Sequence, residues 1–276
     1  MPAKEIKALR EAGKIEEAYT MAKSELAANP QGTWPKRNMS WVYYDYLKLK
    51  NSSEHFDSFI LCLNKIKSLQ LPVEEKILFE QLCWPIGKLA FSLLNCHPVE
   101  THKSIRLLEA IKSFPFPKPS EAYSFIFKAL HKSLKETDHY LQFADWWGFQ
   151  NFMPEDFQKE KLPNGKDVMA LAEQAYIAYA KHLLPKRTPS GELIFNKEKA
   201  ESFLPVLSEI IKHYPQFQYP AYFKAKLLLA LGDNNNMLES LLPFARKKQS
   251  DFWVWEILAE VFLNEPEKVF ACYCKA

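Results

Sequence analysis

The chain has 276 residues, of which 47% are hydrophobic, 14% aromatic and 25% charged. This apolar content is enough for a large buried core and excludes wholesale disorder. Only 7 glycines accompany 18 prolines, whereas a glycine share of roughly 7% is usual. Glycine-rich phosphate loops, hairpin turns and barrel corners need more glycine than this, so an almost wholly helical protein is expected.

Charge and targeting signals narrow the class of protein further. Lysine and arginine total 36 against 33 acidic residues, a net charge of +3 that indicates no whole-protein field directed at nucleic acid or an anionic membrane. The charged start Met1–Lys7 has no apolar signal core, and no run approaches the roughly 18 apolar residues of a membrane span. The five cysteines are odd in number and scattered in apolar surroundings, which is typical of reduced core residues in a cytoplasmic protein. They are Cys62, Cys83, Cys96, Cys272 and Cys274.

A recurring spacing begins at the N-terminus. Gly13 is followed five residues later by Ala18, and Ala18 is followed twelve residues later by Pro30. Glycine suits a turn between two antiparallel helices, alanine permits their close crossing, and proline ends the second helix. Continuing the register from Pro30 places the small and aromatic positions of the next helix at Ser40 and Tyr43.

Prolines divide the rest of the chain into segments of helix length, so about fourteen short helices are expected. Apolar residues recur at intervals of three and four in 54–69 and 105–114, which predicts amphipathic helices. Segment 167–184 is apolar around most of its circumference. This pattern predicts a central helix that is packed on two sides.

Helix starts and irregular stretches alternate along the second half. Ser120, Asn196 and the pair Ser250–Asp251 are the expected N-caps. Three stretches lack helical periodicity: 114–119, 148–166 and 185–196. Within the last of them, Leu193–Phe195 is a candidate for a short extended piece.

The spacing returns at the C-terminus. Trp255, Leu258, Ala259 and Phe262 stand at the intervals Trp-x2-Leu-small-x2-aromatic, and Ala271 follows sixteen residues after the tryptophan. A weaker copy between the two ends is formed by Pro215, Ala225, Leu228 and Gly232. These intervals resemble the tetratricopeptide repeat, a 34-residue helix-turn-helix unit.

The resemblance implies an all-α fold, a right-handed superhelix of antiparallel helix pairs, as a single repeat domain over 1–276. Its expected parts are N-terminal repeats in 1–113, an irregular helical middle in 114–196, and C-terminal repeats in 197–276. The last repeat stops inside its second helix, so the chain is expected to be the N-terminal part of a longer protein. The alternative is an irregular helical domain whose matches to the repeat are accidental.

Three strings carry a narrower resemblance: 217–232, 252–262 and 271–276. They are similar to the helical N-terminal region of a bacterial family linked to TOTE-type conflict systems. Members of that family carry cold-shock-like domains after the helices. The resemblance implies a scaffold in front of a nucleic-acid-binding part, and it transfers no catalytic residue.

Metal sites and catalytic centres have little support in the sequence. The close histidine pairs are His97–His102, which has no third ligand nearby, and His131–His139. Residues i and i+2 of a helix, such as Cys272 and Cys274, point apart. No serine elbow, glycine-rich phosphate loop or reactive cysteine motif is present. We therefore expect neither a cofactor nor an enzyme.

The aromatic clusters have two readings. Core filling is the default, yet no helix can bury all of Trp41, Val42, Tyr43 and Tyr44. In the repeat that the chain resembles, set positions of each first helix face a concave groove. Those positions are Trp34, Arg37, Trp41, Tyr44 and Asp45 in the first full unit, Tyr219, Tyr222, Lys226 and Leu229 in 218–231, and Trp253, Glu256 and Glu260 in the last.

The predicted function is therefore a non-catalytic scaffold that binds a peptide or partner helix through Trp34, Arg37, Trp41, Tyr44, Tyr222 and Lys226. In one alternative, residues 71–196 fill the groove and bury those rings. In the other, the chain contacts the backbone of RNA or DNA through local basic patches, and its affinity then falls steeply with salt. The basic residues are Lys36, Arg37, Arg246, Lys247 and Lys248.

Overall fold

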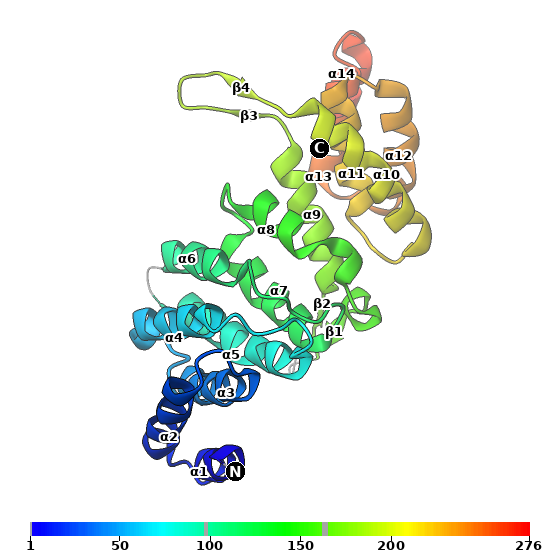
Figure 1. Ribbon diagram of the computed structural model, residues 1–276. Coiled ribbons are helices and arrows are strands. Elements are labelled where there is room, and N and C mark those ends of the chain that lie inside the picture. Colours follow the sequence, from blue (N-terminus) through cyan, green and yellow to red (C-terminus); the bar gives the residue numbers. More distant parts are fainter. Residues whose placement is uncertain (1, 97–98, 162–164) are drawn as a thin grey trace. The chain divides into compact units, whose positions relative to one another are not determined.

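The computed structural model describes residues 2–96, 99–161 and 165–276 (Figure 1). Fourteen α-helices account for most of the residues in these ranges, which confirms the all-α class. The chain divides into two compact units, Met1–Phe157 and Gln158–Ala276. The boundary falls inside the expected irregular middle 114–196, so that stretch contributes to both units.

The first unit consists of eight helices joined by short connections. They are α1 (Pro2–Glu11), α2 (Ile15–Ala28), α3 (Thr33–Leu49), α4 (Phe56–Ser68), α5 (Lys76–Leu94), α6 (Thr101–Ile111), α7 (Glu121–Leu134) and α8 (Tyr140–Trp147), with the 3-10 turns η1 (Ser53–His55), η2 (Phe149–Asn151) and η3 (Pro154–Phe157). The odd-numbered helices α1, α3, α5 and α7 each contact the next in that order. Of the even-numbered helices, α2 packs on α1 and α3, α4 on α3 and α6, and α6 on α5 and α7.

The N-terminal helix pair forms as its sequence predicts. Gly13 adopts a φ of +75° between α1 and α2, a conformation that residues with a Cβ rarely take. Ala18 and Ala22 are fully buried on α2, where their small side chains let neighbouring helices approach closely. α2 ends at Ala28, two residues before Pro30.

The core of the first unit is aromatic around α7. Ser120 caps α7 as expected, because its Oγ accepts a hydrogen bond from the Tyr123 backbone N–H at 3.2 Å. The ring of Phe127 lies 4.5 Å from that of Trp147 and 5.1 Å from that of Phe143. Such buried aromatic clusters contribute beyond their apolar area and fix the positions of the helices that carry them.

One histidine is enclosed in this core. The His131 Nδ1 lies 2.9 Å from the Tyr140 hydroxyl, and the imidazole stacks on Phe127. Burial, together with smaller contributions from the charges of Lys135 and Lys132, lowers the pKa of His131 to about 3. The imidazole is thus a neutral core group.

The fold should therefore lose stability in mild acid. The unfolded chain takes up a proton on His131 near pH 6.5, whereas the folded chain resists it until about pH 3. This residue alone should lower the free energy of unfolding by about 2 kcal/mol between pH 7 and pH 5. In urea denaturation, the free energy of unfolding of His131→Phe/Tyr140→Phe should lose this part of its dependence on pH. The exposed control His139→Gln should retain it. Equal pH dependence in all three proteins would contradict the assignment.

The second unit contains the other six helices and two short antiparallel ribbons. They are β1 (Glu160–Lys161), β2 (Asp167–Val168), α9 (Leu171–Leu183), β3 (Lys186–Arg187), β4 (Leu193–Ile194), α10 (Lys197–His213), α11 (Pro220–Leu231), α12 (Asn234–Lys247), α13 (Phe252–Val261) and α14 (Pro266–Tyr273). β1 pairs with β2 and β3 with β4. α9 contacts α10 and α11, α11 contacts α10 and α12, and α13 contacts α14.

Several local predictions in this unit hold. Asn196 caps α10 by accepting from the Lys199 N–H at 2.9 Å, and Gly232 ends α11 with a φ of +84°. Leu193–Ile194 is extended, as expected, and forms β4. Asp251 precedes α13, but its side chain makes no capping hydrogen bond.

Besides the missing Asp251 cap, three details of the sequence interpretation are wrong. The helix predicted over 167–184 begins only at Leu171, because Val168 belongs to β2 and pairs with Glu160. Ala271, which the sequence placed at the small-residue position of a second helix, is exposed, and Cys272 is the buried residue of α14. Among the cysteines described as core residues, Cys274 is exposed.

A buried carboxylate joins α9 to the start of α11. Glu173 has no exposed surface, and its Oε1 accepts the backbone N–H groups of Gln218 at 2.6 Å and Tyr219 at 3.3 Å. Its Oε2 has no hydrogen-bond partner among the described residues. Burial raises the pKa of Glu173, and the two backbone hydrogen bonds offset this shift only in part.

The sign of this shift predicts a second pH effect. A carboxyl group with a raised pKa binds its proton more tightly in the folded state, so stability falls as pH rises above about 4.5 and through the folded pKa. Glu173→Gln should reduce this fall, and its stability relative to the parent protein should be greater at pH 8 than at pH 5. The exposed control Glu201→Gln should follow the parent at both values. Chemical denaturation at the two pH values measures the difference in free energy of unfolding between Glu173→Gln and the parent protein. The same difference at pH 5 and pH 8 would contradict the prediction.

Candidate functional site

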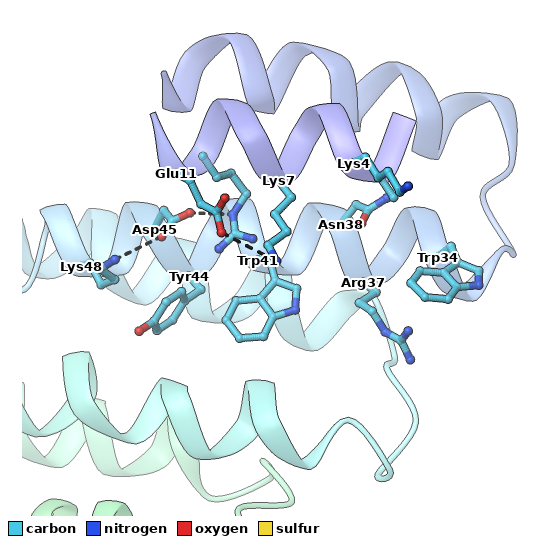
Figure 2. Close-up of a pocket in the computed structure, with 12 residues that line it drawn as sticks. Lys4, Lys7, Glu11, Trp34, Arg37, Asn38, Trp41, Tyr44, Asp45 and Lys48 are labelled. Carbon is cyan, nitrogen blue, oxygen red and sulfur yellow. Dashed lines mark hydrogen bonds and ion pairs between the residues drawn. The ribbon is translucent and has the colours of Figure 1, made fainter. Parts of the chain in front are cut away.

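A pocket of about 700 Å³ opens between α1 and α3 in the first unit (Figure 2). Its lining comes from these two helices: Ala3, Lys4, Lys7, Arg10 and Glu11 from α1, and Trp34, Arg37, Asn38, Trp41, Tyr44, Asp45 and Lys48 from α3. Figure 2 shows Trp34, Arg37, Trp41 and Tyr44 in a row along one side of α3. All five groove positions expected in the first full repeat unit thus meet at one cavity.

The division of α3 into two faces explains why these rings remain accessible. Val42 and Leu47 have no exposed surface and Tyr43 is buried, so they hold the helix to the core. Trp41 and Tyr44 are only half-buried, and Trp34 is 62% exposed. Residues three, four or seven apart share one face of a helix, which places these three rings together on the side opposite the core.

Asp45 organises the charged side of the pocket. The Arg10 Nε donates to its carboxylate at 2.6 Å, and the Lys48 ammonium lies 3.4 Å from it. The Arg10 guanidinium also lies 5.1 Å from the centre of the Trp41 ring, within the range of a cation–π contact. The ring of Trp41 meets that of Tyr44 edge to face at 5.3 Å.

Residues beyond α3 hold the edge of the pocket without filling it. Arg37 forms a two-pronged ion pair with Glu75, which directly precedes α5, and stacks at 4.4 Å on the Trp34 ring. The Tyr44 hydroxyl donates to the Gln81 side-chain oxygen at 3.3 Å, and burial raises the pKa of Tyr44. Both partners come from the stretch 71–196, so within the first unit this stretch contacts Arg37 and Tyr44 and contributes no lining residue to the cavity.

Removal of the Asp45 charge should loosen α1. Asp45→Asn keeps one oxygen for Arg10 but loses the ionic part of the contact, which should cost about 1 to 3 kcal/mol of stability because both groups are largely buried. The matched control is Asp57→Asn, whose ion pair with Arg106 is exposed and should contribute less than about 1 kcal/mol. Thermal unfolding compares the two variants. Equal losses would show that Asp45 does not anchor α1.

The other predicted binding residues lie in the second unit. The Tyr222 ring packs 4.8 Å from that of Trp253 and 5.7 Å from that of Phe244, and the Lys226 ammonium lies 5.4 Å from the Tyr222 ring. Tyr222 therefore belongs to an aromatic cluster inside this unit. It does not line the pocket between α1 and α3.

The residues of the basic alternative are divided between the units. Lys36 and Arg37 are half-buried on α3, and the charge of Arg37 is balanced by Glu75. Arg246 is exposed at the end of α12. Lys247 and Lys248 line a second cavity of about 490 Å³ that also contains Phe217 and Phe244, and Lys248 lies 3.7 Å from Asp251.

Sequence reasoning missed the contribution of α1. Lys4, Lys7 and Arg10 reach the pocket from the first helix, which was assigned no groove residues. Their spacing of three residues was a readable signal, since it places them along one side of a helix. The sequence did not show that this side faces Trp41.

The structure bears on the metal sites and membrane spans considered from the sequence. Among the described residues, no group of three His, Cys, Asp or Glu side chains is arranged to hold a metal ion. His97 lies outside the described residues, and His139 is exposed while His131 is buried. Within the described part of the chain, only α5 is long and apolar enough to cross a membrane, and more than half of it is buried.

The last part of the chain matches the model of a known family. Residues 218–276, which contain α11 to α14, match the model of a family described as a domain of unknown function, DUF7017. No curated protein matches the chain. The matched segment covers almost all of the strings that carry the narrower family resemblance in the sequence.

Proposed function

We propose that this protein is a non-catalytic scaffold for protein–protein interaction, and that the pocket between α1 and α3 binds a peptide or a partner helix. The observation that carries the proposal is the exposure of three large rings around one cavity. Trp34, Trp41 and Tyr44 surround about 700 Å³, although the same helix buries Val42 and Leu47 completely. Exposed aromatic side chains that gather at a concave surface are typical of interaction sites.

The energetics suit reversible binding. A buried aromatic anchor contributes about 1 to 2 kcal/mol or more, so three such anchors with a few hydrogen bonds are sufficient for micromolar affinity. The rings are also partly fixed before a ligand arrives. Arg37 holds Trp34, and Arg10 holds Trp41, which lowers the entropic cost of binding.

The proposal extends to the repeat architecture. We propose that the helix pairs form a right-handed superhelix of the tetratricopeptide type, in a bacterial cytoplasmic protein. The ordered contacts α1–α3–α5–α7, with even-numbered helices packed on them, support this arrangement. In such an array the first helices of successive pairs line the concave side, and we assign α1 and α3, which carry the pocket residues, to these first helices.

The test is selection from a displayed library of random nine-residue peptides on the whole chain, followed by fluorescence anisotropy with the recovered peptides. Trp41→Ala/Tyr44→Ala should weaken binding by at least about 30-fold, because two anchors are lost. Phe270→Ala/Tyr273→Ala, a pair of exposed rings on α14, is the matched control and should leave affinity unchanged. Circular dichroism establishes that each variant is folded.

Two results would overturn the proposal. One is a peptide pool whose affinity is the same for the parent protein and Trp41→Ala/Tyr44→Ala. The other is failure to recover any binding peptide while the protein retains nucleic acid that salt removes, which would favour the basic patches instead.

A further inference from the structure

The aromatic surface does not end at the pocket but continues over α5 and α7. Tyr44 contacts Gln81 on α5, and Trp84 follows Gln81 by one turn on the same face. The Trp84 ring lies 5.2 Å from Phe125 on α7, and Phe125 lies 5.3 Å from Phe91 on α5. We call the side chains Trp41, Tyr44, Gln81, Trp84, Phe91 and Phe125 the aromatic track.

Core packing does not account for the track. All six of its side chains are only half-buried, whereas Leu82 and Ile86 on α5 and Phe127 on α7 have no exposed surface. Gly87 shapes the track, because a Cβ at this position would stand 2.4 Å from the Phe125 ring. The absence of a side chain at Gly87 lets that ring lie across α5, between Trp84 and Phe91.

The track is bordered mainly by cations. The pocket lining has five basic residues against Glu11 and Asp45. On the second half of the track, Lys88 and Lys132 are exposed, and the Lys132 ammonium lies 5.3 Å from the Phe91 ring.

Acidic residues reduce this positive charge without cancelling it. Glu75 neutralises Arg37 at the edge of the pocket. Glu80 and Glu121 each stand one turn before a ring of the track. Cations remain in excess, so an acidic ligand fits the surface best.

We propose that the aromatic track, together with the pocket, binds one extended acidic segment of a partner protein. This inference rests on the proposed function and names its ligand class and its extent. Apolar side chains of the segment lie against the rings, and its carboxylates accept hydrogen bonds from the bordering lysines and arginines. Four neighbouring helices at about 8 to 10 Å spacing match an extended peptide of about seven to nine residues.

The same contacts favour a peptide over single-stranded nucleic acid. Stacking of a base requires a free ring face. Cations already lie over one face of Trp41, Trp34 and Phe91, and a Lys48 ammonium lies 5.4 Å from the Tyr44 ring. A carboxylate can bind these cations while they remain on the rings, because a lysine or arginine has further N–H groups to donate.

The experiment uses the nine-residue peptides selected on the whole chain, a version of each with every Asp and Glu changed to Asn and Gln, and nine-residue oligo-dT. The test variant is Lys88→Gln/Lys132→Gln, which changes only exposed side chains of α5 and α7. Its matched control is Lys23→Gln/Lys67→Gln, which removes the same charge from exposed positions on α2 and α4. Anisotropy titrations at two salt concentrations give the affinities.

We expect the selected pool to be enriched in Asp and Glu. Lys88→Gln/Lys132→Gln should weaken the acidic peptides about threefold to tenfold and leave their amide versions unchanged, while the control variant binds like the parent protein. A pool that depends on Trp41 and Tyr44, yet shows no acidic enrichment or no response to Lys88→Gln/Lys132→Gln, would overturn this inference alone. Tighter binding of oligo-dT than of any peptide, lost in Lys88→Gln/Lys132→Gln, would replace the acidic segment with single-stranded nucleic acid. Peptide binding that is independent of Trp41 and Tyr44 would overturn both proposals.

Discussion

The burial of one face of α3 is the constraint on which the candidate site depends. Val42, Tyr43 and Leu47 enter the core, and this fixes the rotation of the helix about its axis. Because side chains three or four residues apart share a face, the same rotation turns Trp34, Arg37, Trp41 and Tyr44 outward together. A change that released the core face would therefore also disperse the rings of the pocket.

Electrostatics then determines what this surface attracts. Asp45 is enclosed by Arg10 and Lys48, and Glu75 by Arg37, so the acids near the pocket are occupied by the protein's own cations. The remaining lysines line the pocket or are exposed beside the track, and one cation lies over one face of each of the Trp34, Trp41 and Phe91 rings. This surface differs from a simple apolar groove, because it combines fixed rings with an excess of positive charge.

The second unit has a different organisation. Its large aromatic side chains Tyr222, Phe244 and Trp253 contact one another, and its buried carboxylate Glu173 serves to hold the chain before α11. The match to a domain of unknown function falls on α11 to α14 of this unit. The match therefore adds no support to the proposed binding surface of the first unit. That proposal depends on the contacts within the first unit alone.

The sequence by itself determined what local interactions decide. The turn at Gly13, the caps at Ser120 and Asn196 and the common face of Trp34, Arg37, Trp41 and Tyr44 depend on residues within one or two helical turns. Periodicity also predicted the all-α class. The sequence could not separate Val168 from α9 or place Cys272 rather than Ala271 inside, because a shift of one to three residues leaves the local pattern almost unchanged.

Only the tertiary structure decided which helix faces meet. Arg10 lies 35 residues from Asp45, Arg37 lies 38 residues from Glu75, and Tyr44 lies 37 residues from Gln81. Each of these contacts depends on the angle and register at which helices pack, which in turn depend on small buried residues such as Ala18, Ala22 and Gly87. The track over α5 and α7 was hidden for the same reason. Its rings look like core residues in the sequence, and only the packing of α5 on α7 leaves Trp84, Phe91 and Phe125 at the surface.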